Sequence, residues 1–202
     1  KPLTHIDDEE GEISLCILSA INVGKMRNGF SELENLCDLS VRALDELIDY
    51  QGYPVKCAEK ATKRRRSLGV GFIGLAHYLA KCGEHYDDPK AAKLVHELTE
   101  AFQYHLINAS ANLAAEKGPC EGLNETKYSQ GLLPIDHYKE TVDSVTNPPL
   151  LMDWEALREK VKKNGIRNST LSAQMPSESS SVVCNATNGI EPPRDYLSIK
   201  KS

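Results

Sequence analysis

The sequence has no apolar run that approaches the roughly 20 residues needed for a membrane-spanning helix. It also has no apolar signal segment at its start, which reads KPLTHIDD. A surplus of basic residues is missing too, since 24 Lys and Arg face 29 Asp and Glu, for a formal net charge of −5. These absences argue against a membrane protein and against broad binding of nucleic acid through bulk charge. We therefore expect a cytoplasmic protein with no membrane or nucleic-acid partner.

Cysteine is present, but not in a pattern typical of a metal site. The six cysteines are scattered, with no C-x-x-C motif and no histidine pair at zinc spacing. In a reducing compartment most of them are expected to be buried small hydrophobic side chains. The sequence therefore predicts no bound metal, and it leaves room for one thiol with a chemical role. The six are Cys16, Cys37, Cys57, Cys82, Cys120 and Cys184.

Strand-like and helix-like segments alternate along the chain, which favours an α/β fold. A largely apolar run predicts a buried strand over residues 12–22, and a β-prone run covers residues 168–174. Side chains alternate between the two faces of a strand, so Cys16 shares a face with the small residues Ser14 and Ala20. Small neighbours leave space beside the thiol.

Three longer helices are predicted from apolar residues spaced three and four apart. Ser31 with Glu34 forms a capping-box pattern, and Asp88 with Pro89 is a typical N-cap and first helical position. The region 120–149 reads as mostly loop because it is rich in Asn, Gly and Pro. The helices are expected to begin near Ser31, Asp88 and Asp153, and to end near Gly52, Gly118 and Gly165.

Gly69, Gly71 and Gly74 match the G-x-G-x-x-G pattern of dinucleotide-binding folds. That motif requires a strand that ends in a tight turn, so that backbone amides meet the pyrophosphate. Here the apolar run continues through the glycines from Leu68 to Leu79, which favours close backbone packing over nucleotide binding. A nicotinamide-dependent dehydrogenase is an alternative function that calorimetry with NAD would test.

The run of Lys and Arg at residues 63–66 has two possible roles. It could contact phosphate or a partner protein, but such a run is more often a solvated face. We expect the solvated face.

The stretch QMPSESSSVVC, residues 174–184, places a proline and four serines between a β-prone run and an apolar continuation. This order is typical of the first turn of a helix, where amides without intrahelical partners favour an anion. Serine hydroxyls add donors, whereas Glu178 would repel phosphate unless its side chain turns away. Ordinary N-capping by serine is the competing interpretation, and the stretch alone leaves both open.

Several runs of the sequence resemble the large, catalytic subunit of class I ribonucleotide reductase. They occur in the family's order and span nearly the whole chain, and the last three are the most specific. The runs are GEISLCILSA (11–20), RRSLGVG (65–71), LLPID (132–136), GIRNSTLSA (165–173), PSESS (176–180) and NATNGIEPPR (185–194).

The resemblance implies that residues 1–202 form a single segment of the catalytic domain, a ten-stranded α/β barrel with surrounding helices. In this family ribonucleoside diphosphates lose their 2′-hydroxyl, which supplies deoxynucleotides for DNA synthesis. A separate small subunit with a metal-radical cofactor generates a cysteine thiyl radical that abstracts the 3′ hydrogen. A pair of cysteines then supplies two electrons, and thioredoxin or glutaredoxin reduces the resulting disulfide.

The resemblance also assigns site residues. Cys16 matches one member of the redox pair. Ser179 stands where a threonine is common in the family, which keeps the hydroxyl. The residues that match the diphosphate-binding loop are Pro176, Ser177, Glu178, Ser179 and Ser180.

Parts of the family's pattern are missing from the sequence. These are the Asn-x-Cys-x-Glu loop with the radical cysteine, the first redox cysteine, the N-terminal regions that bind ATP and deoxynucleotide effectors, and the C-terminal tyrosines and shuttle cysteines. We therefore expect a partial chain that binds no cofactor itself and is inactive alone.

The expected partners are a ribonucleoside diphosphate, the rest of the large subunit, the small subunit, thioredoxin or glutaredoxin, and a second copy in a homodimer. The alternative is a noncatalytic fragment of a split large subunit that acts only after assembly with the missing part.

Overall fold

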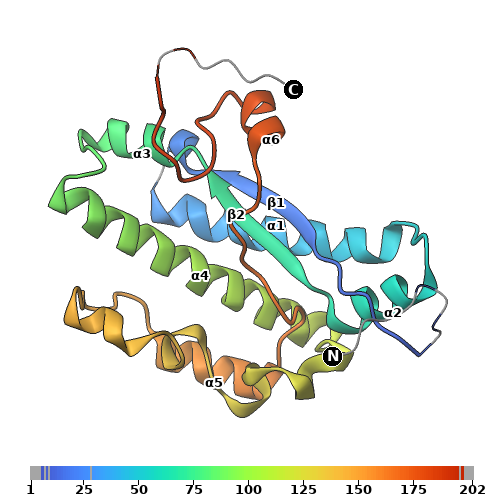
Figure 1. Ribbon diagram of the computed structural model, residues 1–202. Helices are drawn as coiled ribbons and strands as arrows, with labels where there is room; N and C mark the ends of the chain where they lie inside the picture. Colours follow the sequence, from blue (N-terminus) through green and yellow to red (C-terminus); the bar gives the residue numbers. More distant parts are fainter. Residues whose placement is uncertain (1–5, 7, 9, 28, 196, 198–202) are drawn as a thin grey trace.

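Two parallel strands form the sheet of the protein. The computed structural model describes residues 6, 8, 10–27, 29–195 and 197. Strand β1 (Ile17–Asn22) pairs with strand β2 (Leu68–Ile73), with Ile17 opposite Leu68 (Figure 1). Parallel strands need a long crossover connection, and here helices α1 and α2 provide it. The helices are α1 (Phe30–Tyr50), α2 (Lys56–Arg65), α3 (Leu75–Cys82), α4 (Pro89–Lys117), α5 (Trp154–Asn164) and α6 (Glu178–Val183).

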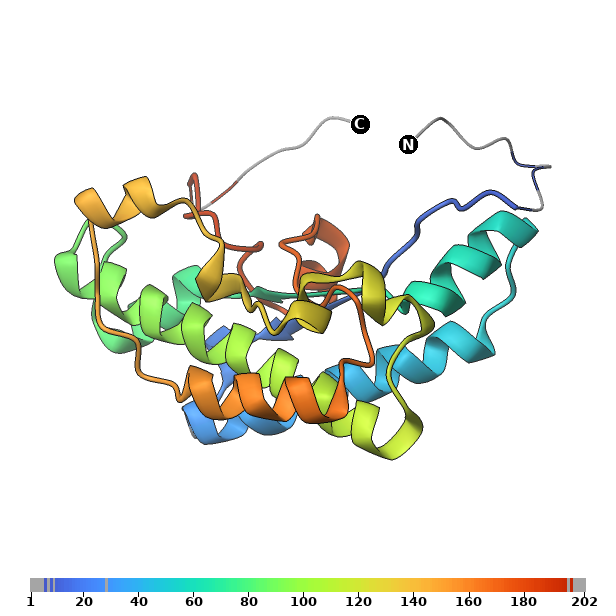
Figure 2. The same ribbon diagram turned by 90° about the horizontal axis from the view of Figure 1, so that it is seen from below.

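Helices α1 and α4 cover one face of the sheet, and α6 lies on the other side (Figure 2). We call the first the covered face, which carries the buried side chains of Leu68, Val70 and Phe72. Phe72 packs edge-on against Phe102 of α4, with ring centroids 5.3 Å apart. The apolar stripe of α1 lies in the same core, as its helical spacing predicts. None of the helices in the described residues is long and apolar enough to cross a membrane.

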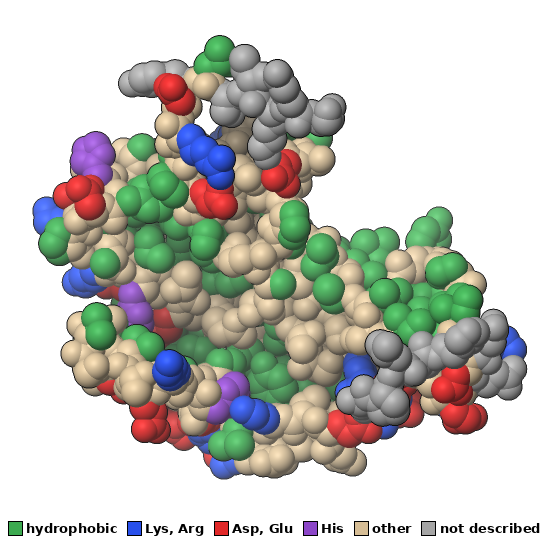
Figure 3. Space-filling view, viewed as in Figure 1, with side chains coloured by type: hydrophobic (Ala, Val, Ile, Leu, Met, Phe, Trp, Pro, Cys, Tyr) green, Lys and Arg blue, Asp and Glu red, His purple; other side chains and the backbone are tan. Residues whose placement is uncertain are grey.

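The other side of the sheet, which we call the open face, carries Cys16, Leu18, Gly69 and Gly71. Leu18 keeps 48% of its surface exposed there. Figure 3 shows hydrophobic side chains at the surface on this side of the molecule, which is hollowed below α6. Helices α1 and α4 thus bury one face of the sheet, whereas Cys16 and Leu18 remain exposed on the other.

The segment 168–174 runs beside β2 but forms only a single β-bridge, between Ser172 and Val70. The amide of Val70 donates to the carbonyl of Leu171 (2.8 Å), and the amide of Ala173 donates to the carbonyl of Val70 (3.0 Å). The position predicted for this segment was therefore right, but the extent of regular strand structure was overestimated.

The predicted strand over 12–22 was wrong at its start. Strand β1 begins only at Ile17, because the chain before it bonds to α2 rather than to β2. The amide of Ile13, for example, donates to the carbonyl of Cys57 (3.2 Å). Cys16 therefore lies one residue before the strand.

The predicted capping box at Ser31 was also wrong. Helix α1 begins at Phe30, and Gly29 is its N-cap with a φ of +61°, a conformation that glycine adopts without strain. Ser31 lies inside the first turn. The amide of Arg27, just upstream, donates to the carboxylate of Glu32 (2.7 Å).

The other two long helices agree with their predicted limits. Helix α4 begins at Pro89 after the N-cap Asp88, although the Asp88 carboxylate accepts from the amide of His85 (2.6 Å) rather than from the helix. Asp153 caps α5 by accepting from the amide of Ala156 (2.9 Å). The predicted loop region contains four short 3-10 helices: Glu121–Glu125, Lys127–Gln130, Pro134–Asp136 and Glu140–Ser144.

The basic run 63–66 is a solvated face only at Lys63, because Arg64 and Arg65 are half-buried and Arg66 is buried, which corrects the expectation from its charge. Arg66 is buried and donates to the fully buried Asp45 (2.7 Å) and to Asp49 (2.8 Å). Burial lowers the pKa of Arg66, but the hydrogen bonds to Asp49 and Asp45 more than offset this and raise its pKa above the usual value. Arg167 also donates to Asp45 (3.2 Å), so the network joins α1, the end of α2 and the segment that follows α5.

Candidate functional site

The open face of β2 is flat because two of its residues are glycines. A Cβ atom at Gly69 would lie 2.5 Å from Cδ2 of Leu18 and 3.2 Å from Cβ of Ala173. A Cβ atom at Gly71 would collide with the carbonyl of Ala173 and lie 2.6 Å from Sδ of Met175. Both glycines lie within the strand, so they do not form the turn that binds a pyrophosphate. The geometry favours the close packing inferred from the sequence over the dehydrogenase alternative.

Cys16 lies at the start of this open face with an exposed side chain. Its Sγ is 3.8 Å from the position that a Cβ atom of Gly69 would occupy, and Cδ2 of Leu18 approaches the same point. Cys16 and Leu18 therefore share a face, as the alternation of the sequence predicts.

The other cysteines separate into two groups. Cys37, Cys57 and Cys120 are buried, so half of the six cysteines are buried rather than most of them, as had been expected. Burial raises the pKa of the Cys37 thiol to about 12, with a smaller contribution from the charge of Glu34. Cys82 and Cys184 are exposed, so exposure alone does not distinguish Cys16. What distinguishes Cys16 is its place beside the glycines of the open face.

The serine-rich stretch forms the first turn of a short helix, as its pattern predicts. Helix α6 begins at Glu178, with Ser177 as its N-cap, but no side chain caps a helix amide. Most of the hydroxyls have partners within the chain: Ser180 donates to the carbonyl of Ser177 (3.2 Å), and Ser181 donates to the carbonyl of Glu178 (2.9 Å). The hydroxyl of Ser179 is exposed and has no hydrogen-bond partner among the described residues.

A cavity of about 300 Å³ lies beside this turn, between the segments 174–178 and 188–191. Two backbone hydrogen bonds place it at the carboxyl end of β2. The amide of Gly74 donates to the carbonyl of Thr187 (2.9 Å), and the amide of Leu75 donates to the carbonyl of Gly189 (3.4 Å). In open α/β sheets, ligands bind at the carboxyl ends of the strands.

Cys16 and this cavity lie at opposite ends of one surface. Gly69 is beside Cys16, Gly71 is beside Met175, and Gly74 is bonded to the segment that closes the cavity. A strand rises about 3.3 Å per residue, so Gly69 and Gly74 are about 16 Å apart along the chain. The structure thus places the predicted thiol and the predicted anion-binding turn along one strand, although Cys16 does not line the cavity itself.

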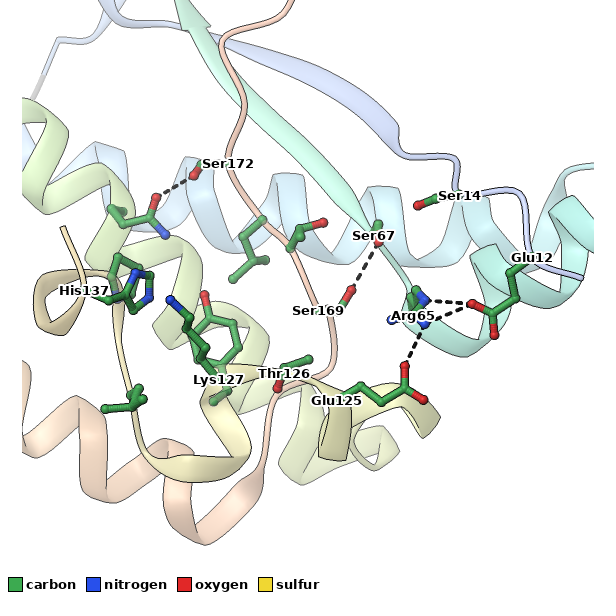
Figure 4. Close-up of a pocket in the computed structure, with 16 residues that line it drawn as sticks. Glu12, Ser14, Arg65, Ser67, Glu125, Thr126, Lys127, His137, Ser169 and Ser172 are labelled. Atoms are coloured by element: carbon green, nitrogen blue, oxygen red, sulfur yellow. Dashed lines mark hydrogen bonds and ion pairs between the residues drawn. The ribbon is translucent and has the colours of Figure 1, made fainter. Parts of the chain in front are cut away.

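A larger cavity, of about 720 Å³, lies between the segment 169–172 and the short 3-10 helices (Figure 4). Its charged groups are mostly paired, since Arg65 donates to Glu12 (2.9 Å) and to Glu125 (2.7 Å). Burial raises the pKa of Glu12, but hydrogen bonds from Arg65 and Arg64 more than offset this and lower its pKa. Neither Cys16 nor the residues 176–180 line this cavity.

Sequence reasoning gave no signal for this second cavity, because its lining comes from distant segments with no common periodicity. Within the part of the chain that the structure describes, no group of three or more His, Cys, Asp or Glu residues is arranged to hold a metal ion.

Comparisons with known proteins agree on one family. A family model described as the barrel domain of ribonucleotide reductase matches residues 4–202.

The ribonucleoside-diphosphate reductase subunit alpha of Haemophilus influenzae is 58% identical over 202 residues, which is 100% of this chain and 27% of that protein. The corresponding subunit of Enterobacteria phage T4 is 50% identical over 202 residues, covering 100% of this chain and 26% of that protein. The Escherichia coli K12 subunit 1 alpha is 56% identical over 155 residues, or 77% of this chain and 20% of that protein. The chain spans about a quarter of the length of the curated relatives that it matches in full.

Proposed function

The chain belongs to the ribonucleotide reductase family, as part of the barrel domain of the class I large subunit, and from this premise we propose that it contributes a redox thiol and a diphosphate site to ribonucleotide reduction. The reaction is the conversion of ribonucleoside diphosphates to deoxyribonucleoside diphosphates. The observation that carries the proposal is the position of Cys16 and of the turn 176–180 at the two ends of the open face of β2.

We propose that β1, β2 and the segment 168–174 are neighbouring strands of a ten-stranded α/β barrel, with all 202 residues in one segment of that domain. The covered face would then lie outside, beneath α1 and α4, and the open face would lie inside. Support comes from the small residues and exposed apolar side chains of the open face, such as Gly69, Gly71 and Leu18. A barrel that filled its interior with bulky side chains would leave no space for a nucleotide.

Cys16 is the proposed member of the redox pair. It and a second cysteine outside this chain would each give up one proton and one electron and join in a disulfide. The 2′-hydroxyl of the ribose would leave as water, and a hydrogen would take its place on the carbon. The radical that starts the reaction would come from the metal-containing small subunit, and thioredoxin or glutaredoxin would reduce the disulfide. The remaining partners are the rest of the large subunit and a second copy in a homodimer, with ATP and deoxynucleotide effectors bound outside these residues.

The turn formed by Pro176, Ser177, Glu178, Ser179 and Ser180 is the proposed diphosphate site. Amides in the first turn of a helix lack intrahelical partners and donate readily to phosphate oxygens. The hydroxyl of Ser179 is available to add a further donor. Glu178 lines the adjoining cavity. Because its carboxylate would repel phosphate, its backbone amide is the group proposed to bind.

Replacing Cys16 by serine in the complete subunit tests this function. We expect Cys16→Ser to abolish the multiple turnovers that thioredoxin sustains, because no disulfide can form, while substrate affinity stays nearly unchanged. Cys82→Ser is the matched control, since Cys82 is also exposed but lies at the end of α3. Undiminished turnover by Cys16→Ser would exclude the proposed role. The same proposal implies that this chain alone has no reductase activity until the missing part of the subunit is supplied.

A further inference from the structure

The side chain of Asn188 accepts the hydroxyl proton of Ser177 across the smaller cavity. The Ser177 Oγ to Asn188 Oδ1 distance is 2.6 Å, and Ser177 is 4% exposed. Because this hydrogen bond uses the proton of Ser177, the hydroxyl of Ser177 is not available as a phosphate donor. Ser177 instead serves the turn through its carbonyl, which accepts from the amide of Ser181 (2.8 Å) and from the hydroxyl of Ser180 (3.2 Å).

Asn188 itself is held in place from both sides. The carbonyl of Thr187 accepts from the amide of Gly74, and the carbonyl of Gly189 accepts from the amide of Leu75, so Asn188 lies between two backbone hydrogen bonds to the junction of β2 and α3. One residue further on, the hydroxyl of Tyr86 donates to the carbonyl of Ile190 (3.0 Å). These bonds fix Asn188 relative to β2.

The backbone next to Asn188 permits this close approach. Gly189 has a φ of +49°, which glycine adopts without strain, and a Cβ atom there would lie 3.4 Å from Oγ of Ser177. The Asn188 side chain is therefore a defined link between β2 and the start of α6.

We propose that Asn188 is a positioning residue for the diphosphate: it holds Ser177, and through Ser177 it holds the first turn of α6 at a fixed place above the carboxyl end of β2. The inference rests on the proposed function of residues 176–180. It divides the serines into two kinds: Ser177 is held by Asn188 and positions the turn, whereas Ser179 supplies a hydroxyl to the ligand.

Steady-state kinetics of the complete enzyme with a ribonucleoside diphosphate test this role. We expect Asn188→Ala to raise KM about five- to tenfold, the scale of one hydrogen bond, and to leave kcat within about twofold. Ser177→Ala removes the same bond from its other end and should have the same effect. The double variant should be no worse than either single variant, because only one interaction is lost.

Two further variants separate the inference from the function on which it rests. Ser179→Ala removes the proposed ligand-facing hydroxyl, and its effect on KM should multiply with that of Asn188→Ala. Asn147→Ala is the control, because Asn147 is exposed and its side chain has no hydrogen-bond partner among the described residues. It should leave both constants unchanged.

The outcomes are distinct. If Ser179→Ala raises KM and Asn188→Ala does not, the positioning role is excluded while the diphosphate site stands. If the effects of Asn188→Ala and Ser177→Ala multiply, the two residues act separately and the positioning role is likewise excluded. If none of the variants changes KM, the proposed diphosphate site fails and the positioning role fails with it. Should Asn188→Ala not fold, Ser177→Ala decides, because it leaves the segment 187–190 unaltered.

Discussion

The two faces of β2 differ sharply in what packs against them. Leu68, Val70 and Phe72 lie beneath α1 and α4 with almost no exposed surface. On the opposite face, Gly69 and Gly71 contribute no side chains, and the segment 173–175 and the side chain of Leu18 pack closely on them. The comparison shows that one strand separates two tasks. The covered face supplies the apolar burial that stabilises the fold, whereas the glycines of the open face let other segments pack closely on the strand and leave Cys16 and Leu18 exposed.

The largest expected difference between the two faces is in the rate at which their cysteine thiols are modified. We expect iodoacetamide at pH 8 to modify Cys16 at least about a thousandfold faster than Cys37, because a thiol with a pKa near 12 is almost wholly protonated at that pH and Cys37 is also buried. Peptide mass spectrometry over a time course of the native chain would measure both rates. In denaturant the two rates should converge, and similar rates in the native chain would contradict the assignment of the faces.

Truncating a side chain should lower the free energy of unfolding more on the covered face than on the open face, although this difference between the faces is smaller than that in thiol reactivity. Phe72→Ala removes a buried ring that packs on Phe102, and it should lower the free energy of unfolding by about 3–5 kcal/mol. Leu18→Ala, on the open face, removes a side chain that is already 48% exposed, and it should cost less than about 1 kcal/mol. Guanidinium denaturation of the chain would compare them. Equal losses would mean that the open face is packed as tightly as the covered one.

The smallest expected effect concerns the rim of the sheet, where Glu12 pairs with Arg64 (2.8 Å) and Arg65 (2.9 Å). The pKa of Glu12 is lower in the folded state than its ordinary value of 4.5. Its stabilisation is therefore present above pH 4.5 and is lost as the pH falls through the folded-state pKa.

Glu12→Gln should consequently cost about 1 kcal/mol or less at pH 7, and this cost should disappear as the pH falls through the folded-state pKa of Glu12. Denaturation curves at a series of pH values would measure the difference from the original chain. The other carboxylates are common to both proteins and cancel in that difference. Parallel pH profiles would show that the pair contributes no stability.

Local signals in the sequence were sufficient for some elements. Pro89 and Asp153 marked the starts of α4 and α5 because helix capping depends on neighbouring residues only. The start of β1 and the burial of the basic run 63–66 depended instead on contacts with residues distant in the sequence. Arg66, for example, is paired with Asp45, which lies 21 residues earlier, and no local charge pattern reveals such a pair.

The candidate site likewise contains residues that the sequence indicated and one residue that only the structure revealed. Cys16 and the turn 176–180 were found through family resemblance, and the family assignment is confirmed by the match to residues 4–202. Their roles remain proposals. Asn188 lies within one of the matched runs, but its significance depends on a contact with Ser177, eleven residues away, which required the three-dimensional structure.

The most direct measurement is the structure of the complete subunit with a bound ribonucleoside diphosphate. We expect the phosphates to contact the amides of residues 178–180 and the hydroxyl of Ser179, and we expect the ribose to lie over the open face of β2, toward the thiol of Cys16. A nucleotide bound in the larger cavity beside Arg65, or on the covered face, would contradict the division of tasks between the two faces.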